Sequence, residues 1–163
     1  MKIPNKPPSD LKVPLKILLA DDDKDDRFFF DKALKALPIP TQLTTVENGE
    51  QLMNYLIKNS EKLPDVLFLD LNMPRKNGSE CLSEIKQNPK LKELPVIIYS
   101  TSLHEDVADL LYKNGAYYYV HKTDLEELEK ILLKLLTLMK EKKFIRPPRE
   151  EFICNIYKNT LIL

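Results

Sequence analysis

Five strand-like runs alternate with helical patterns over most of this 163-residue chain. Between the runs, apolar residues recur at helical spacing, as Phe30, Ala33 and Leu34 do, which is typical of a helix with one buried face. Strands that alternate with helices form parallel sheets with helices on both faces. We therefore predict an α/β domain with a five-stranded parallel sheet, whose strands are Lys16–Ala20, Gln42–Val46, Asp65–Leu69, Pro95–Ser100 and Tyr117–Val120.

Helix boundaries also follow from the sequence. Pro38, Pro89 and Gly115 lie where helices are expected to end. The segments Ser102–Glu105 and Thr123–Glu126 match the capping box, in which Ser or Thr and a Glu three residues later satisfy free helix amides reciprocally. We therefore expect one helix to begin at each of these two segments.

The two ends of the chain differ from its centre. Residues 1–14 hold four of the twelve prolines and are predicted to be a flexible arm, followed by one domain over residues 15–143. Residues 144–163 form a C-terminal extension that is too short for a second domain. Half of its last fourteen residues are apolar, namely Phe152, Ile153, Ile156, Tyr157, Leu161, Ile162 and Leu163. We expect residues 150–163 of this extension to pack on their own domain or on a second copy, and the latter would make a homodimer.

Charge and composition limit the classes of function. Lysines and arginines number 25, as do aspartates and glutamates, so no excess positive charge is present to bind nucleic acid. No apolar run approaches the ~20 residues that a membrane span needs, and the N-terminus lacks the apolar stretch of a signal peptide. Cys81 and Cys154 have no metal-ligand spacing. A cytoplasmic protein that binds neither nucleic acid nor membrane is the simplest expectation.

Acidic residues follow two of the predicted strands directly. Asp70 ends the apolar run Val66–Leu69, and Asp21 and Asp22 follow the first strand. Ligands of open α/β sheets bind just beyond the carboxyl ends of the strands. Asp25 and Asp26 lie further on, where helix N-termini favour acids, and we interpret them in that way; the role of Asp23 stays open.

Polar residues at the ends of the other strands complete a candidate site. If strands one, three and four are neighbours, Ser100-Thr101 lies beside Asp70, and the last strand adds Lys122. Three carboxylates at such close range need a neutralising positive charge, which Lys122 or a hard divalent cation such as Mg²⁺ would supply. Asp70 stands alone between the other groups, so we predict that it is a nucleophile toward phosphorus.

This arrangement resembles the receiver domain of two-component response regulators, from about Lys16 to Lys140. The motifs occur in the family's order: Asp21-Asp22, Leu69–Pro74 with Gly78, Ser100-Thr101 and Tyr119–Lys122. The resemblance implies a doubly wound, flavodoxin-like sheet of strand order 2-1-3-4-5. Long loops, the Lys122-Thr123 pair and the extended C-terminus are also similar to the stand-alone regulators that act with bacterial phytochromes.

The resemblance also implies a role for each site residue. Asp70 would be the phosphoacceptor, and Mg²⁺ would be bound by Asp21, Asp22, Asp70 and the backbone carbonyl of Asn72. Ser100 would hydrogen-bond the phosphoryl group and Lys122 would pair with it, while Ser100 and Tyr119 would form the switch. The residue type that each of these seven roles needs is present.

Two positions depart from the family's usual pattern. The family usually has Pro after the lysine, commonly with a cis bond, whereas Thr123 follows Lys122 here. A non-proline cis bond costs ~3–4 kcal/mol, so a trans bond that aims Lys122 differently is an alternative. Ser100 replaces the commoner Thr but keeps the hydroxyl.

The function that the resemblance implies is that of a stand-alone response regulator in a phosphorelay. It would accept a phosphoryl group on Asp70 from a sensor histidine kinase or a histidine phosphotransfer protein, and signal through altered protein–protein interaction without being a turnover enzyme. One alternative is a haloacid-dehalogenase-like, Mg²⁺-dependent phosphatase, but that family has its nucleophile after the first strand and a second Asp where Asn72 stands. Another alternative is a degenerate receiver that acts as a scaffold.

Overall fold

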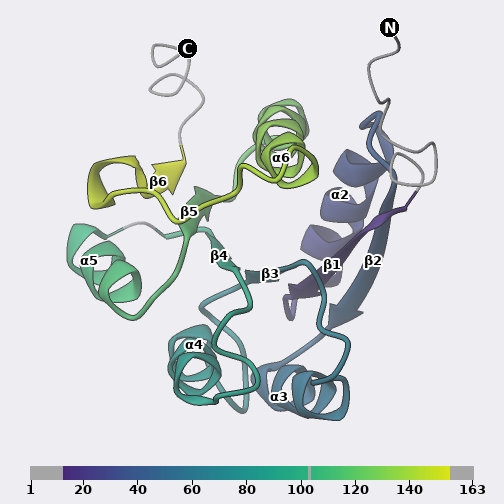
Figure 1. Ribbon diagram of the computed structural model, residues 1–163. Helices are drawn as coiled ribbons and strands as arrows, with labels where there is room; N and C mark the ends of the chain where they lie inside the picture. Colours follow the sequence, from purple (N-terminus) through teal and green to yellow (C-terminus); the bar gives the residue numbers. More distant parts are fainter. Residues whose placement is uncertain (1–12, 103, 155–163) are drawn as a thin grey trace, which may run out of the picture.

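A parallel six-stranded sheet runs through the centre of the molecule in the order β2-β1-β3-β4-β5-β6 (Figure 1). The computed structural model describes residues 13–102 and 104–154. The first five strands follow the order 2-1-3-4-5, which confirms the predicted doubly wound, flavodoxin-like sheet. The strands are β1 (Leu15–Ala20), β2 (Thr41–Val46), β3 (Val66–Leu69), β4 (Val96–Ser100), β5 (Tyr118–His121) and β6 (Ile153–Cys154).

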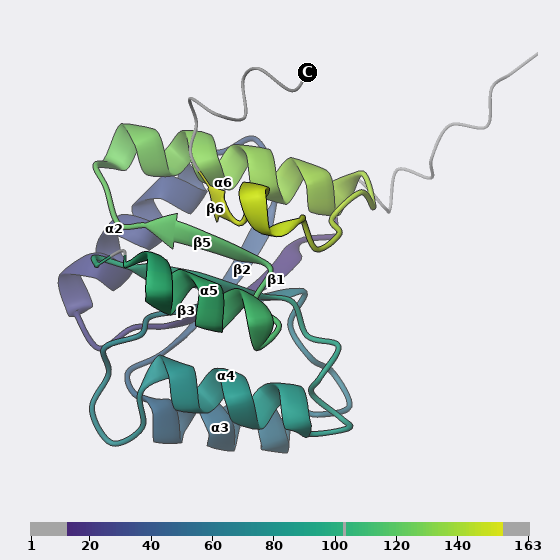
Figure 2. The same ribbon diagram turned by 90° about the vertical axis from the view of Figure 1, so that its left-hand side faces the viewer.

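Helices cover both faces of the sheet (Figure 2). Buried residues of α2 and α6 form the core on one face, and buried residues of α3, α4 and α5 form the core on the other. Each helix buries one side only, as the spacing of its apolar residues predicts. The helices are α2 (Lys24–Lys35), α3 (Gly49–Lys58), α4 (Gly78–Gln87), α5 (Glu105–Lys113) and α6 (Leu125–Lys140).

The two middle strands are buried along their whole length. Every residue of β3 and of β4 is buried, because helices lie on both faces of the sheet at this point. The edge strand β2 is mostly half-buried or exposed. The polar residues that follow β3 and β4 therefore lie at the end of a rigid, fully packed support.

Two helices begin later than the capping-box motifs predict. The N-cap of α5 is His104 rather than Ser102, and it makes no side-chain capping bond. The N-cap of α6 is Asp124 rather than Thr123, and its carboxylate accepts the N–H of Glu127 at 2.9 Å. A carboxylate is the stronger acceptor at the positive end of a helix, so Asp124 displaces Thr123. The predicted stop at Gly115 is confirmed, because this residue has the left-handed φ of 102° that follows a helix end.

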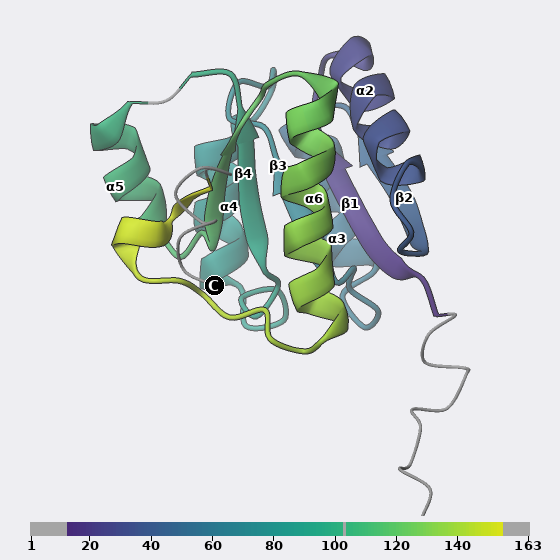
Figure 3. The same cartoon turned by 90° about the horizontal axis from the view of Figure 1, so that it is seen from above.

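The C-terminal extension supplies the sixth strand, which corrects the prediction of five. After α6 the chain turns back between α6 and α5 (Figure 3). The segment Arg149–Glu151 forms one 3-10 turn, and β6 then pairs in parallel with β5, with Tyr119 opposite Ile153 and Val120 opposite Cys154. The pairing covers an edge strand that would otherwise expose unpaired backbone groups.

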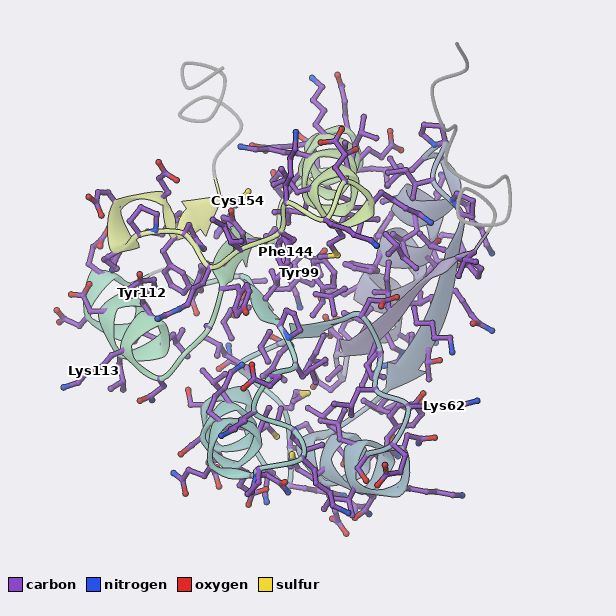
Figure 4. All side chains as sticks on the ribbon, viewed as in Figure 1. Lys62, Tyr99, Tyr112, Lys113, Phe144 and Cys154 are labelled. Carbon is purple, nitrogen blue, oxygen red and sulfur yellow. The ribbon has the colours of Figure 1, made fainter. Side chains whose placement is uncertain are left out.

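Side chains fix the extension to α5. Tyr112 lies on α5 (Figure 4). It donates its hydroxyl proton to the carbonyl of Pro147 at 2.8 Å, and its ring lies 3.8 Å from the guanidinium carbon of Arg146. Arg149 pairs with Asp109 at 2.7 Å and with Glu105 at 3.0 Å. The described part of the extension therefore packs on its own domain, as one of the two predicted alternatives requires.

Two predictions concern residues outside the described ranges. The first is the flexible arm, of which residues 1–12 are not described. The second is the packing of the extension, of which the apolar residues Ile156, Tyr157, Leu161, Ile162 and Leu163 are not described. Within the described ranges, no helix is long and apolar enough to cross a membrane.

Candidate functional site

The carboxyl ends of four neighbouring strands converge on the candidate site. Asp21 follows β1, Asp70 follows β3, Ser100 ends β4 and Lys122 follows β5. The strand register places these residues at a similar level along the sheet, because Ala20 is opposite Leu69 and Leu69 is opposite Ile98. Four residues spread over positions 21 to 122 of the sequence are thereby brought to one edge of the sheet.

Three carboxylates form the acidic part of the site. Asp21, Asp22 and Asp70 each offer an oxygen, and these oxygens lie within 4.8 Å of one another. Asp21 and Asp70 are buried, at 0% and 4% exposure, whereas Asp22 is open to solvent. A set of hard oxygen donors with one exposed side fits a divalent ion such as Mg²⁺ or Mn²⁺ that keeps part of its water shell.

Lys122 supplies the positive charge of the site. Its Nζ lies 2.8 Å from Oδ2 of Asp21 and 3.5 Å from Oδ2 of Asp70. No peptide bond among the described residues is cis, so the Lys122–Thr123 bond is trans, and the lysine still reaches Asp70. The alternative of a trans bond is therefore the one observed.

Asp26 is a further member of the site that the sequence interpretation missed. Its Oδ2 accepts a hydrogen bond from Lys122 Nζ at 2.8 Å, so its interpretation as an acid favoured by the helix dipole is incomplete. The missed signal is helical spacing. Asp26 lies one turn before Phe30 and thus on the buried face of α2. Asp23 is the N-cap of α2 and accepts the N–H of Asp25 at 2.8 Å, so its open role is resolved as a helix cap.

Burial and charge oppose each other at the ionisable groups. Burial raises the pKa of Asp70 to about 6, against the opposing effect of Lys122, and it also raises the pKa of Asp21. Burial alone would lower the pKa of Lys122, but its hydrogen bonds to Asp21 and Asp26 hold this pKa above its usual value. The lysine therefore stays charged, whereas the carboxylate of Asp70 gains a proton when the pH falls slightly below neutral.

We expect the carboxyl group of Asp70 to titrate near pH 6 when chelator keeps the protein free of metal. The pKa of about 6 lies above the ordinary 3.8, so the folded state binds this proton more tightly than the unfolded chain. The contribution of Asp70 to the free energy of unfolding therefore increases as the pH falls from about 6 toward 4. Carboxyl ¹³C NMR would measure the midpoint, with Asp70→Asn to assign the signal. A midpoint near 4 would contradict the expectation.

Ser100 and Tyr119 lie beside the acidic group. Ser100 is fully buried, and its hydroxyl makes no hydrogen bond within the described part of the chain. Tyr119 is also buried, and its hydroxyl donates to the backbone carbonyl of Ser102. A serine hydroxyl at this position can donate a hydrogen bond to an acceptor that enters the site.

The loop after Asp70 is held by close backbone packing. The N–H of Asn72 points to Oδ1 of Asp70 at 3.4 Å, whereas the role of the Asn72 carbonyl stays a prediction. Gly78 begins α4, and a Cβ atom at this position would lie 2.3 Å from the carbonyl oxygen of Asp70. Only glycine allows α4 to approach the end of β3 this closely.

The comparison with protein families identifies the class of protein. The sequence model of the response regulator receiver domain matches residues 17–133. The chain therefore belongs to the response regulator receiver family, whose members act in two-component signalling.

Stand-alone response regulators are among the most similar relatives and solved structures. The response regulator Rcp1 of Synechocystis sp. (strain ATCC 27184 / PCC 6803 / Kazusa) is 36% identical over 124 residues, which cover 73% of this chain and 84% of Rcp1. The structure of the phosphorylated cyanobacterial phytochrome response regulator RcpA has a TM-score of 0.72 at 33% identity, over 83% of this chain and 100% of RcpA. The Mn²⁺-bound form of Rcp1 has a TM-score of 0.71 at 34% identity, with the same coverage.

Proposed function

We propose that this protein accepts a phosphoryl group on Asp70 from a phosphohistidine of a sensor kinase or a phosphotransfer protein. The observation that carries the proposal is one buried carboxylate, Asp70, which lies between two further acids and a half-buried lysine. In the proposed step, a carboxylate oxygen of Asp70 forms a bond to phosphorus as the nitrogen–phosphorus bond breaks. The product is an acyl phosphate on Asp70 and a free histidine.

The other site residues each have a part in this proposal. Asp21, Asp22, Asp70 and the carbonyl of Asn72 would hold Mg²⁺, which neutralises charge on the phosphoryl oxygens when bound. The ammonium of Lys122 would pair with one phosphoryl oxygen, and the hydroxyl of Ser100 would donate to another. A phosphoryl oxygen would supply an acceptor for the buried hydroxyl of Ser100, and this new hydrogen bond would move Ser100 on phosphorylation.

Phosphotransfer profiling tests the proposal directly. Each candidate kinase or phosphotransfer protein is first labelled on histidine and then mixed with this protein and Mg²⁺. We expect rapid, stoichiometric transfer from a cognate donor, and no sustained release of phosphate from an added phosphomonoester. Steady turnover of the phosphomonoester would favour a phosphatase instead, and failure of every donor, small phosphodonors included, would favour a scaffold.

We also propose that phosphorylation is sensed on the surface formed by α5, β5 and α6 at the β5 end of the sheet. The backbone N–H of Tyr119 donates to the carbonyl of Phe152 at 2.9 Å, so this residue links the site to the C-terminal extension. A ligand shifts a conformational equilibrium only through contacts that differ between the two states. Movement of Ser100 and Tyr119 would change the contacts that hold α5 and the extension.

With beryllofluoride and Mg²⁺ as a phosphoryl mimic, we expect amide shifts to extend through residues 102–122. The hydrogen bond from Tyr119 to Phe152 should carry shifts into Phe152 and Ile153 as well. Two-dimensional NMR of the labelled protein would measure them, and Asp70→Asn would serve as the unresponsive control. Shifts confined to the immediate neighbours of Asp70 would contradict the switch.

A further inference from the structure

Asp26 accepts a hydrogen bond from Lys122, whose ammonium also contacts Asp21 and Asp70. This hydrogen bond joins the first turn of α2 to the residue after β5, 96 positions apart in the sequence, at 2.8 Å. We propose that Asp26 is a positioning residue, which draws the ammonium of Lys122 away from Asp70 and leaves the oxygens of Asp70 free for the metal and the phosphoryl donor. This inference rests on the proposed function of Asp70.

The distances around the ammonium show that Lys122 lies closer to Asp21 and Asp26 than to Asp70. Nζ of Lys122 lies 2.8 Å from Asp21 and 2.8 Å from Asp26, but 3.5 Å from Asp70. An ammonium has three protons and binds best where carboxylates surround it. The two shorter contacts both come from the segment that follows β1, so they hold the lysine on the side of the site away from β3.

Packing keeps Asp26 in place. Its own backbone N–H donates to the cap residue Asp23 at 3.3 Å, and one turn later Phe30 is fully buried. The ring of Phe30 lies 5.5 Å from that of Tyr99, and Lys122 Nζ lies 5.2 Å from the centre of the Tyr99 ring. A continuous series of contacts therefore connects Asp26 with Lys122, Tyr99 and Phe30.

Exposure separates Asp26 from the other carboxylates that contact Lys122. The Asp26 side chain is 31% exposed, whereas the side chains of Asp21 and Asp70 are 0% and 6% exposed. Water stabilises the charge of Asp26, so this residue holds the lysine without being part of the buried acidic group. If Asp26 loses its charge, the lysine has only Asp21 and Asp70 left, and it should move toward Asp70.

The variant Asp26→Asn tests this inference, with Asp25→Asn as the matched control. Both changes remove one charge from the first turn of α2, but Asp25 is exposed, whereas Asp26 contacts Lys122. We expect Asp26→Asn to weaken Mg²⁺ binding by about three- to tenfold, because the lysine then competes for Asp70 and one negative charge is lost. Phosphorylation by a small phosphodonor should slow by about the same factor. Asp25→Asn should change the Mg²⁺ affinity and the phosphorylation rate by less than about twofold, because solvent and salt screen the charge of an exposed side chain.

A measurement without metal separates positioning from a general effect on activity. The ¹⁵Nζ and ¹³Cε signals of Lys122 in chelator should shift in Asp26→Asn, stay unchanged in Asp25→Asn, and largely return in Asp26→Glu, which restores the charge. Equal Lys122 signals and equal Mg²⁺ affinities in the Asn variants at positions 25 and 26 would overturn the inference. If wild type takes up no phosphoryl group, the proposed function fails, whereas these signals and affinities still decide the role of Asp26.

Discussion

Asp70→Asn should abolish phosphorylation of this protein. An amide is too weak a nucleophile to attack phosphorus, and no other buried carboxylate stands alone at the end of a central strand within the described residues. We expect wild type, mixed with a small phosphodonor and Mg²⁺, to gain the mass of one phosphoryl group. The rate of phosphorylation of the variant should be at least ~100-fold lower. Intact-protein mass spectrometry over time would measure both.

The controls for this experiment address the site and the metal separately. Asp106→Asn changes an exposed aspartate of α5, far along the chain from the acidic group, and should be labelled like wild type. Excess chelator should suppress labelling of wild type, because the three carboxylates then repel the incoming phosphoryl group. Undiminished labelling of Asp70→Asn, or labelling in chelator, would contradict the assignment of Asp70 or of the metal.

Phe152→Ala should be among the most destabilising single changes in the C-terminal extension. Phe152 is fully buried, and its ring lies 5.3 Å from that of Tyr112 and 6.4 Å from that of Tyr119. Removing a buried Phe side chain lowers the free energy of unfolding by ~3–5 kcal/mol. We expect about 3 kcal/mol, the lower end of that range, because the extension can detach instead of leaving a cavity. Chemical denaturation followed by circular dichroism would measure the change.

Ile145→Ala is the matched control for Phe152→Ala. It lies in the same segment, but it is 74% exposed and should change the free energy of unfolding by less than about 0.5 kcal/mol. A chain truncated after Lys143 extends the test to the whole extension. Lower stability with an unchanged molecular mass in light scattering supports packing on the same domain. A decrease from a dimeric to a monomeric mass would instead support a homodimer held by this extension, and no change in either would contradict both.

The loss of the extension should also affect signalling under our proposal. Phe152 accepts the backbone N–H of Tyr119, and Arg149 pairs with two acids of α5. The extension thus lies over part of the side that we propose as the sensor of phosphorylation. A partner that reads this side would meet the extension as well as α5 and β5.

Local pattern in the sequence was sufficient for most of the fold. Apolar runs such as Val66–Leu69 and the helical spacing of Phe30, Ala33 and Leu34 each depend on neighbours in the chain, so they can be read without the structure. The predicted strands agree with the observed ones to within one residue at each end. The positions of Asp21, Asp70, Ser100 and Lys122 followed from strand ends, because parallel strands place their carboxyl ends at one edge.

Contacts between distant segments decided the remainder, because no local pattern encodes them. The hydrogen bond of Asp26 to Lys122 and the pairing of Ile153 with Tyr119 both join residues far apart in the chain. The raised pKa of Asp70 comes from burial, which depends on the whole packed sheet. Local pattern was therefore enough to locate the first five strands, the helices between them and the residues at the strand ends. Which carboxylates contact the lysine, and where the C-terminal extension packs, could be seen only in the folded molecule, since both depend on distances that the fold sets.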